Sequence, residues 1–182
     1  AYFDWTGSSA QAPGPVNFYL HVGLAKAVVG QVLTRMLGSG LARNDGYYDL
    51  IHVTLPEGSV LKPGFPAAVG RHGTTMARHR EILGAAIHRQ EPARISGAGS
   101  GSGPTFSFAG DGFRLVDWLP QGGGARPDRD GTDAIDDHMT LEALEADYPV
   151  VIESLRALPD TGGAGRCRGG AGTEKVYRLL AA

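Results

Sequence analysis

Cysteine is almost absent from this sequence of 182 residues, in which Cys167 is the one thiol. A lone cysteine can form neither an internal disulfide nor a cysteine-based metal cluster, so both kinds of framework are excluded. We interpret Cys167 as an incidental loop residue. The composition fits a protein of the reducing cytoplasm, which is the location that we expect.

A dominant charge of one sign is also missing, because 17 Lys and Arg residues face 19 Asp and Glu residues, giving a net charge of −2. Such a chain offers no broad basic field to nucleic acid or to an anionic membrane surface. Long apolar runs are missing too, since Lys26 and Gln31 interrupt the best one, and no membrane span is predicted. Because the sequence begins with Ala1 instead of Met, we expect it to be a piece of a longer protein.

Glycine, in contrast, is abundant, with 28 residues, roughly twice the usual share. The glycines cluster at 97–103, 122–124, 162–165 and 169–172, between well-formed apolar segments. This pattern is typical of an ordered protein with tight loops, and only 97–103 resembles a flexible linker. No cluster has the lysine of a P-loop, the strand-to-helix context of a dinucleotide fingerprint, or the repeated Arg-Gly-Gly units of RNA binders.

Apolar periodicity predicts three helices. Residues 20–37 have the amphipathic spacing, and Gly38 is a suitable end for that helix. A second helix is predicted to begin with Thr74 or Thr75 as its cap and to reach about residue 90. A short third helix is predicted over 140–147, where Tyr148-Pro149 ends it.

Short β-rich runs predict the strands, with a turn at Asn44-Asp45-Gly46 and a hairpin around 109–112. Helices and strands mix without a regular alternation, so we expect an α+β fold with mixed sheets, a few helices and long Gly-rich loops. The predicted strands cover 2–9, 48–55, 105–108, 113–119, 150–158 and 175–181.

The stretch 128–138 carries five aspartates and His138 within eleven residues. Oxygen ligands of this kind suit a hard divalent cation, although the spacing is not that of an EF-hand. The alternative is a structural loop in which Asp130 or Asp133 pairs with Arg126. The residues leave both interpretations open.

Five blocks, taken together and in order, resemble the hydantoinase B/5-oxoprolinase subunits. The first is Phe3-Asp-Trp-Thr-Gly-Ser-Ser-Ala-Gln-Ala-Pro-Gly-Pro-Val-Asn17. The third is Gly122-Gly-Gly-Ala-Arg126-Pro-Asp-Arg-Asp130-Gly-Thr-Asp133, with His138-Met-Thr140. The others lie at 44–69, 144–149 and 160–172. We therefore expect residues 1–182 to be a C-terminal, incomplete portion of such a subunit.

This resemblance implies a two-component hydrolase of cyclic amides. A hydantoinase A-type partner would use ATP and Mg²⁺ to phosphorylate the carbonyl of a lactam or hydantoin, and the B-type component, with its N-terminal portion, would complete hydrolysis. It implies catalytic roles for Arg126, Asp130 and His138, substrate contacts for Asp4, Asn17, Asn44 and Asp45, and metal ligands in Asp133 and His138.

Two alternatives remain open. Segments 70–75 and 96–103 depart from the family pattern, and the latter lacks the family's asparagines. A non-catalytic assembly piece would fit these departures. A component of a related ATP-dependent ketone carboxylase is the other alternative.

Overall fold

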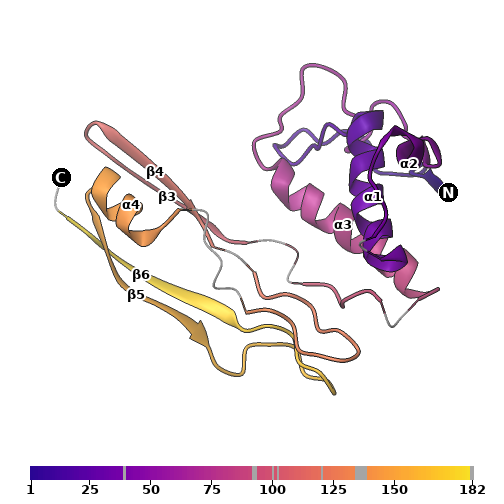
Figure 1. The fold of residues 1–182 in the computed structure, drawn as a ribbon. Coiled ribbons are helices and arrows are strands. Elements are labelled where there is room, and N and C mark those ends of the chain that lie inside the picture. Colours follow the sequence, from indigo (N-terminus) through magenta and orange to yellow (C-terminus); the bar gives the residue numbers. More distant parts are fainter. Residues whose placement is uncertain are drawn as a thin grey trace. The chain divides into compact units, whose positions relative to one another are not determined.

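The computed structural model describes residues 1–38, 40–91, 94–99, 101, 103–119, 121–133 and 139–180. The chain divides into unit 1, Ala1–Ile95, and unit 2, Ser96–Ala182, which we treat separately. Both units contain helices and strands, which confirms the predicted α+β class (Figure 1). None of the helices in the described part of the chain is long and apolar enough to cross a membrane.

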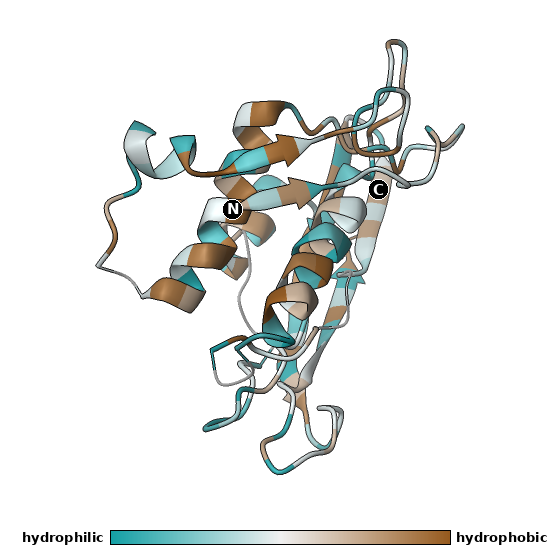
Figure 2. Ribbon diagram, turned by 90° about the vertical axis from the view of Figure 1, so that its right-hand side faces the viewer, coloured by the Kyte–Doolittle hydropathy of each residue, from teal (hydrophilic) through white to brown (hydrophobic). Residues whose placement is uncertain are grey.

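Two helices form most of unit 1. The first, α1, runs over Val22–Leu37 and begins at His21, whose ring Nδ1 accepts the N–H of Leu24 at 3.3 Å. It ends as predicted at Gly38, which has a positive φ of 108° and donates its N–H to the Thr34 carbonyl at 2.9 Å. Hydrophilic and hydrophobic residues alternate around the helices (Figure 2), so one side of each helix can be buried.

The second long helix, α3, covers His72–His88. The prediction of a cap at Thr74 or Thr75 is wrong, because the helix begins at His72. Arg71, three residues before Thr74, occupies the cap without a side-chain hydrogen bond. A threonine cap would have satisfied one of the free N–H groups of the first turn. Here the Thr75 hydroxyl instead donates to the Val16 carbonyl at 2.5 Å, which fixes the helix to the preceding loop.

The strands of unit 1 are shorter than predicted. Strand β1, Tyr2–Asp4, pairs in parallel with β2, His52–Thr54, and each has three residues. The expected turn at 44–46 is instead the start of a short helix, α2, Asp45–Asp49. Asn44 caps it by accepting the Tyr47 N–H at 3.1 Å. Asparagine is as common at helix caps as it is in turns.

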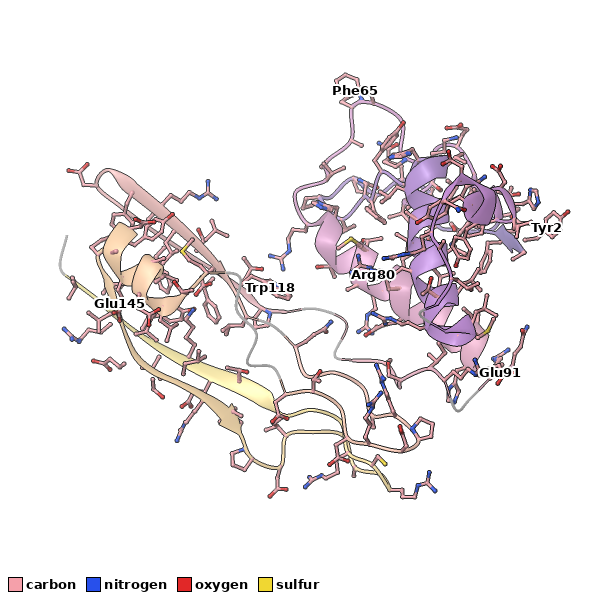
Figure 3. The ribbon with its side chains drawn as sticks, viewed as in Figure 1. Tyr2, Phe65, Arg80, Glu91, Trp118 and Glu145 are labelled. Carbon is pink, nitrogen blue, oxygen red and sulfur yellow. The ribbon has the colours of Figure 1, made fainter. Side chains whose placement is uncertain are left out.

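Apolar side chains of α1, α3 and β2 fill the interior of unit 1. One cluster joins Val29, Ile51 and Leu83, and a neighbouring one joins Phe18, Leu20 and Leu61. One large apolar side chain of unit 1 lies outside these clusters. Phe65, in the loop between β2 and α3, is fully exposed. Figure 3 shows its ring pointing away from the rest of unit 1.

In its described residues, unit 2 contains two antiparallel hairpins and one helix. Strands β3, Thr105–Gly110, and β4, Phe113–Trp118, form the predicted first hairpin. Strands β5, Val150–Leu158, and β6, Gly172–Leu179, form the second. The helix α4, Leu141–Asp147, lies in the predicted range 140–147, and Thr140 is its cap. Its buried Leu144 packs with Leu115 and Val150, so it joins the two hairpins in one small core.

A buried polar cluster also links the hairpins. Lys175 on β6 places Nζ 2.7 Å from Oδ2 of Asp117 on β4. The hydroxyl of Tyr177 donates to the same oxygen at 2.5 Å. We did not predict this cluster, since Asp117 and Lys175 lie 58 residues apart and neither belongs to a recognisable motif.

Candidate functional site

The glycine clusters of unit 2 do not form separate loops but pack on one another. We call the segments 97–99, 121–125, 131–133, 161–164 and 168–172 the glycine layer. Backbone bonds join them, from Gly97 N to the Ala125 carbonyl at 2.7 Å and from Gly170 N to the Gly123 carbonyl at 2.8 Å. The interpretation of the 97–103 run as a flexible linker is therefore wrong for residue 97, which belongs to this layer.

Close backbone contact explains why the layer needs glycine. A Cβ atom on Gly124 would lie 1.8 Å from the Gly97 carbonyl oxygen, and one on Gly170 would lie 1.8 Å from the Thr132 carbonyl oxygen. Neither distance is compatible with a side chain of any size. Glycine is required here by the approach of neighbouring chain segments and not by an unusual backbone angle.

We call residues 128–133, the described part of the acidic stretch, the acidic loop. Two of its carboxylates bind backbone N–H groups of the glycine layer. Oδ1 of Asp130 accepts the Arg168 N–H at 2.7 Å, and Oδ1 of Asp133 accepts the Ala171 N–H at 2.7 Å. Both residues are exposed, and both bonds cross 38 positions of sequence. The expected ion pair of one of these aspartates with Arg126 is not what holds the loop, because backbone N–H groups take that place.

Arginines lie along the same loops. Arg168 pairs with Asp160, its Nη1 lying 2.8 Å from Oδ1, and Arg166 donates to the Pro127 carbonyl at 2.5 Å. Arg126 is exposed, and its backbone N–H donates to the Arg129 carbonyl at 2.9 Å. Arg126, Asp130 and Asp133 thus lie on one short segment that the glycine layer supports.

A pocket of about 600 Å³ opens in the glycine layer, and we call it the glycine pocket. Backbone atoms of Gly122–Gly124 and Gly169–Gly170 form much of its wall. Gln121, Thr161, Cys167 and Thr173 also line it, as does Leu119. Residues of the 160–172 loop line this pocket, among them Cys167, which we had interpreted as incidental. No sequence motif indicated it.

The predicted substrate-binding residues of unit 1 hold its loops together. Asn17 is completely buried; its Oδ1 accepts the Ala12 N–H at 2.8 Å, and its Nδ2 donates to three carbonyls, of Ala12, Gly14 and Ala68. Asn44 caps α2, and Asp45 lies in its first turn.

Asp4 has a local role as well. Its Oδ1 accepts the Thr6 N–H at 2.8 Å. Hydrogen bonds from the Thr6 side chain and backbone lower the pKa of this exposed carboxyl. The contacts of Asp4, Asn17, Asn44 and Asp45 are thus structural ones, and substrate binding by these residues stays a prediction.

The metal prediction rests on two residues, of which the structure describes one. Asp133 is described, whereas His138 lies outside the described residues, as do Asp136 and Asp137. Among the residues that are described, no group of three His, Cys, Asp or Glu side chains gathers as a metal site. The described residues alone therefore form no metal site, and metal binding by Asp133 with His138 stays a prediction.

His79 is a buried polar residue of unit 1. It lies on α3, is 3% exposed, and its ring centroid is 5.3 Å from that of Trp5. Neither ring nitrogen has a hydrogen-bond partner in the described structure. Burial, and to a smaller extent the charge of Arg80, lower the pKa of His79 to about 4, so the ring is neutral at physiological pH.

Sequence comparison places these features among known proteins. The model of the family described as hydantoinase B/oxoprolinase matches residues 1–182. A 5-oxoprolinase of Dictyostelium discoideum is 28% identical over 191 residues, which cover 99% of this chain and 14% of that protein. A Pseudomonas protein, named for the B component of a D-/L-hydantoinase, is 25% identical over 193 residues, which cover 98% of this chain and 32% of that one.

Two solved structures are similar to the chain. The ATP-dependent caprolactamase of Pseudomonas jessenii has a TM-score of 0.73 and 25% identity, covering 95% of this chain and 33% of that one. A nucleotide-free acetone carboxylase has a TM-score of 0.69 and 18% identity, covering 97% of this chain and 26% of that one. The second likeness concerns the fold alone. The chain spans a third or less of the length of each of these four proteins.

Proposed function

The chain belongs to the hydantoinase B/oxoprolinase family, and from that membership we propose that it forms part of an ATP-dependent hydrolase of cyclic amides. The observation that carries the proposal is the match of the family over all 182 residues. The likeness to an ATP-dependent caprolactamase supports it, since caprolactam is itself a cyclic amide.

The chemistry explains why ATP would be needed. An unstrained lactam is a poor electrophile, and transfer of a phosphoryl group to its carbonyl oxygen turns that oxygen into part of a leaving group. Water can then add to the carbonyl carbon, the ring C–N bond breaks, and the ring nitrogen takes up a proton, which leaves an acyl phosphate. A second water hydrolyses the acyl phosphate to the carboxylate and inorganic phosphate. We assign ATP and Mg²⁺ to a hydantoinase A-type partner, and the hydrolytic step to this chain with the rest of its subunit.

The supported acidic loop is our candidate for the reacting residues. Arg126 carries an exposed guanidinium that suits phosphate or oxyanion oxygens. Asp130 has one carboxylate oxygen held by the Arg168 N–H, so its position is fixed while the group stays exposed. We propose Asp130, together with His138, as the general base, and Asp133 and His138 as the residues through which a divalent metal would be held.

An assay of ATP turnover tests this proposal. The chain, with its A-type partner and the remainder of the subunit, is offered caprolactam, hydantoin and 5-oxoproline, and ADP release is measured. We expect at least one cyclic amide to stimulate ATP hydrolysis. Stimulation only by a ketone with bicarbonate would point to a carboxylase, and no stimulation of a folded assembly would favour a non-catalytic assembly piece.

Matched variants connect the activity to the loop. Asp130→Asn keeps an oxygen that can accept the Arg168 N–H but removes the charge, and we expect it to lower kcat by about 100-fold or more. His138→Ala is expected to have a similar effect. Asp128→Asn is the control, because Asp128 is exposed on the same loop and has only a 4.0 Å contact with Arg129. Equal activity of the Asp130 and Asp128 variants would remove Asp130 from the mechanism.

A further inference from the structure

The sequence contains three Asp-Gly pairs, Asp45-Gly46, Asp111-Gly112 and Asp130-Gly131. In such a pair the glycine has no side chain to shield its peptide nitrogen, so that nitrogen can attack the carboxyl group of the preceding aspartate. All three aspartates are exposed, so exposure alone does not distinguish between them. The structure distinguishes them by the contacts that hold the nitrogen and the carboxylate.

Both reacting groups of Asp130-Gly131 are hydrogen-bonded to one residue. Oδ1 of Asp130 accepts the Arg168 N–H at 2.7 Å, and the Gly131 N–H donates to the Arg168 carbonyl at 2.8 Å. The backbone at Gly131 is also closely packed, because a Cβ atom there would lie 2.0 Å from the Gly123 carbonyl oxygen. Ring closure would have to break both hydrogen bonds before the nitrogen could approach the carboxyl carbon.

Asp45-Gly46 is held by regular secondary structure. Asp45 is the first residue of α2, and Asn44 caps this helix from the position before it. Backbone N–H groups of a helix lie roughly parallel to its axis, so the Gly46 nitrogen can reach the Asp45 carboxyl carbon only when the helix unwinds. Because α2 has five residues, this protection depends on a short element.

Asp111-Gly112 has neither kind of protection. The pair forms the turn between β3 and β4, where Gly110 is paired with Phe113. Among the described contacts, neither the Asp111 carboxylate nor the Gly112 N–H has a hydrogen-bond partner. A Cβ atom on Gly112 would meet no heavy atom within 4 Å, so the turn has open space around it. The nitrogen and the carboxyl carbon can therefore meet without the loss of any contact.

We propose that Asp111 is a site of spontaneous isomerisation to isoaspartate, and that the contacts of Arg168 protect Asp130 from the same reaction. First the Gly112 nitrogen bonds to Cγ of Asp111, and a carboxyl oxygen leaves as water with the carboxyl proton and the peptide proton. Water then adds to the main-chain carbonyl carbon of Asp111, and the bond from that carbon to the Gly112 nitrogen breaks. The main chain now runs through the former side-chain carboxyl group, and the mass is unchanged.

Ageing of the folded chain tests the proposal. The chain, whose folding is checked by circular dichroism, is kept for several weeks at physiological temperature and pH and then digested. Peptides with aspartate and isoaspartate are separated by chromatography and identified by electron-transfer fragmentation. We expect isoaspartate to form at Asp111 about tenfold faster or more than at Asp130, with Asp45 between them. Equal rates at Asp111 and Asp130, or a faster rate at Asp130, would contradict the proposal.

The same chain in urea separates the effect of the structure from that of the sequence. Unfolding removes the Arg168 contacts and the helix α2, while the residues next to each pair stay the same. The rate at Asp130 should therefore rise until the ratio of the Asp111 rate to the Asp130 rate is close to one. A ratio that urea leaves unchanged would assign the difference to the neighbouring residues and overturn the protection by Arg168.

A matched variant assigns the product to one residue. Asp111→Glu keeps the charge of the turn, but its longer side chain would have to close a six-membered ring, which forms more slowly. Total isoaspartate is measured in the aged chain as the methyl groups that an isoaspartyl methyltransferase transfers to it. We expect Asp111→Glu to remove most of this signal, and a signal equal to that of the parent chain would place the isomerisation at another residue.

Discussion

Lys175 and Asp117 form an ion pair of 2.7 Å whose two side chains are 0% and 5% exposed. Removal of one partner leaves the other charge buried without compensation, so Lys175→Met is expected to destabilise unit 2 by about 3 to 5 kcal/mol. Urea unfolding followed by Trp118 fluorescence, in a Trp5→Phe background, measures this in unit 2 alone.

The double variant Lys175→Met/Asp117→Leu measures the interaction energy between the two side chains. Its loss of stability should be smaller than the sum of the two single losses, because no lone charge remains. Tyr177→Phe, which removes one hydroxyl from the cluster, should cost only about 1 to 2 kcal/mol. Strict additivity of the two single variants would contradict an interaction between these side chains.

His79 makes unit 1 sensitive to acid. Its pKa is lowered from 6.5 to about 4, so between these pH values the unfolded chain binds a proton that the folded chain does not. The free energy of unfolding is therefore highest above pH 6.5 and falls as the pH drops towards 4, by about 2 kcal/mol after allowance for solvent screening. Trp5, whose ring is 5.3 Å from His79, reports this in a Trp118→Phe background.

His79→Leu should remove this part of the acid sensitivity, since leucine fills the same apolar space and binds no proton. His88→Leu is the matched control, because it replaces an exposed histidine at the end of the same helix. An acid profile that both variants share with the parent chain would show that His79 does not titrate as proposed.

The glycine layer predicts a sharp contrast between neighbouring glycines. Gly170→Ala places a Cβ atom 1.8 Å from the Thr132 carbonyl oxygen, so chain segments must move apart, at a cost of about 3 kcal/mol or more. Gly163→Ala meets no atom within 4 Å and should change stability by less than about 0.5 kcal/mol. Denaturant midpoints measure both, and similar losses would contradict the close packing.

Asn17 and Asn44 were both expected to contact substrate, but their replacement should reduce the stability of unit 1 by different amounts. Asn17→Ala leaves the Ala12 N–H and three carbonyls without their partner in a buried place, and we expect a loss of about 2 to 4 kcal/mol. Asn44→Ala removes one capping bond and should cost about 1 kcal/mol. Losses in the opposite order would mean that the buried network contributes little.

The local features of the fold could be predicted from the sequence. Apolar spacing predicted α1, and Gly38 was recognised as its end from the chemistry of glycine. The range 140–147 was predicted for α4, which covers Leu141–Asp147. The prediction failed at Asn44, because asparagine favours both a turn and a helix cap and only the following residues decide between them. Strand lengths in unit 1 were overestimated, since β1 and β2 stop where pairing stops.

Long-range contacts could not be predicted in this way. The resemblance to a family selected the segment containing Asp130 and Asp133, but not the backbone N–H groups 38 residues away that hold them. The glycine clusters predicted tight loops, whereas their function of packing on one another depends on which segments meet. A pocket lined by backbone has no side-chain motif, so no pattern of residues indicated it.

The glycine layer has a thermodynamic consequence for unit 2. Unit 1 is held by two clusters of large apolar side chains, whereas the core cluster described for unit 2 has three buried members, Leu115, Leu144 and Val150. The heat capacity of unfolding grows with the apolar area that unfolding exposes. Segments that are joined through peptide groups expose little apolar area when they separate. The stability of unit 2 should therefore change less with temperature, per residue, than that of unit 1, with a flatter maximum and greater resistance to cold.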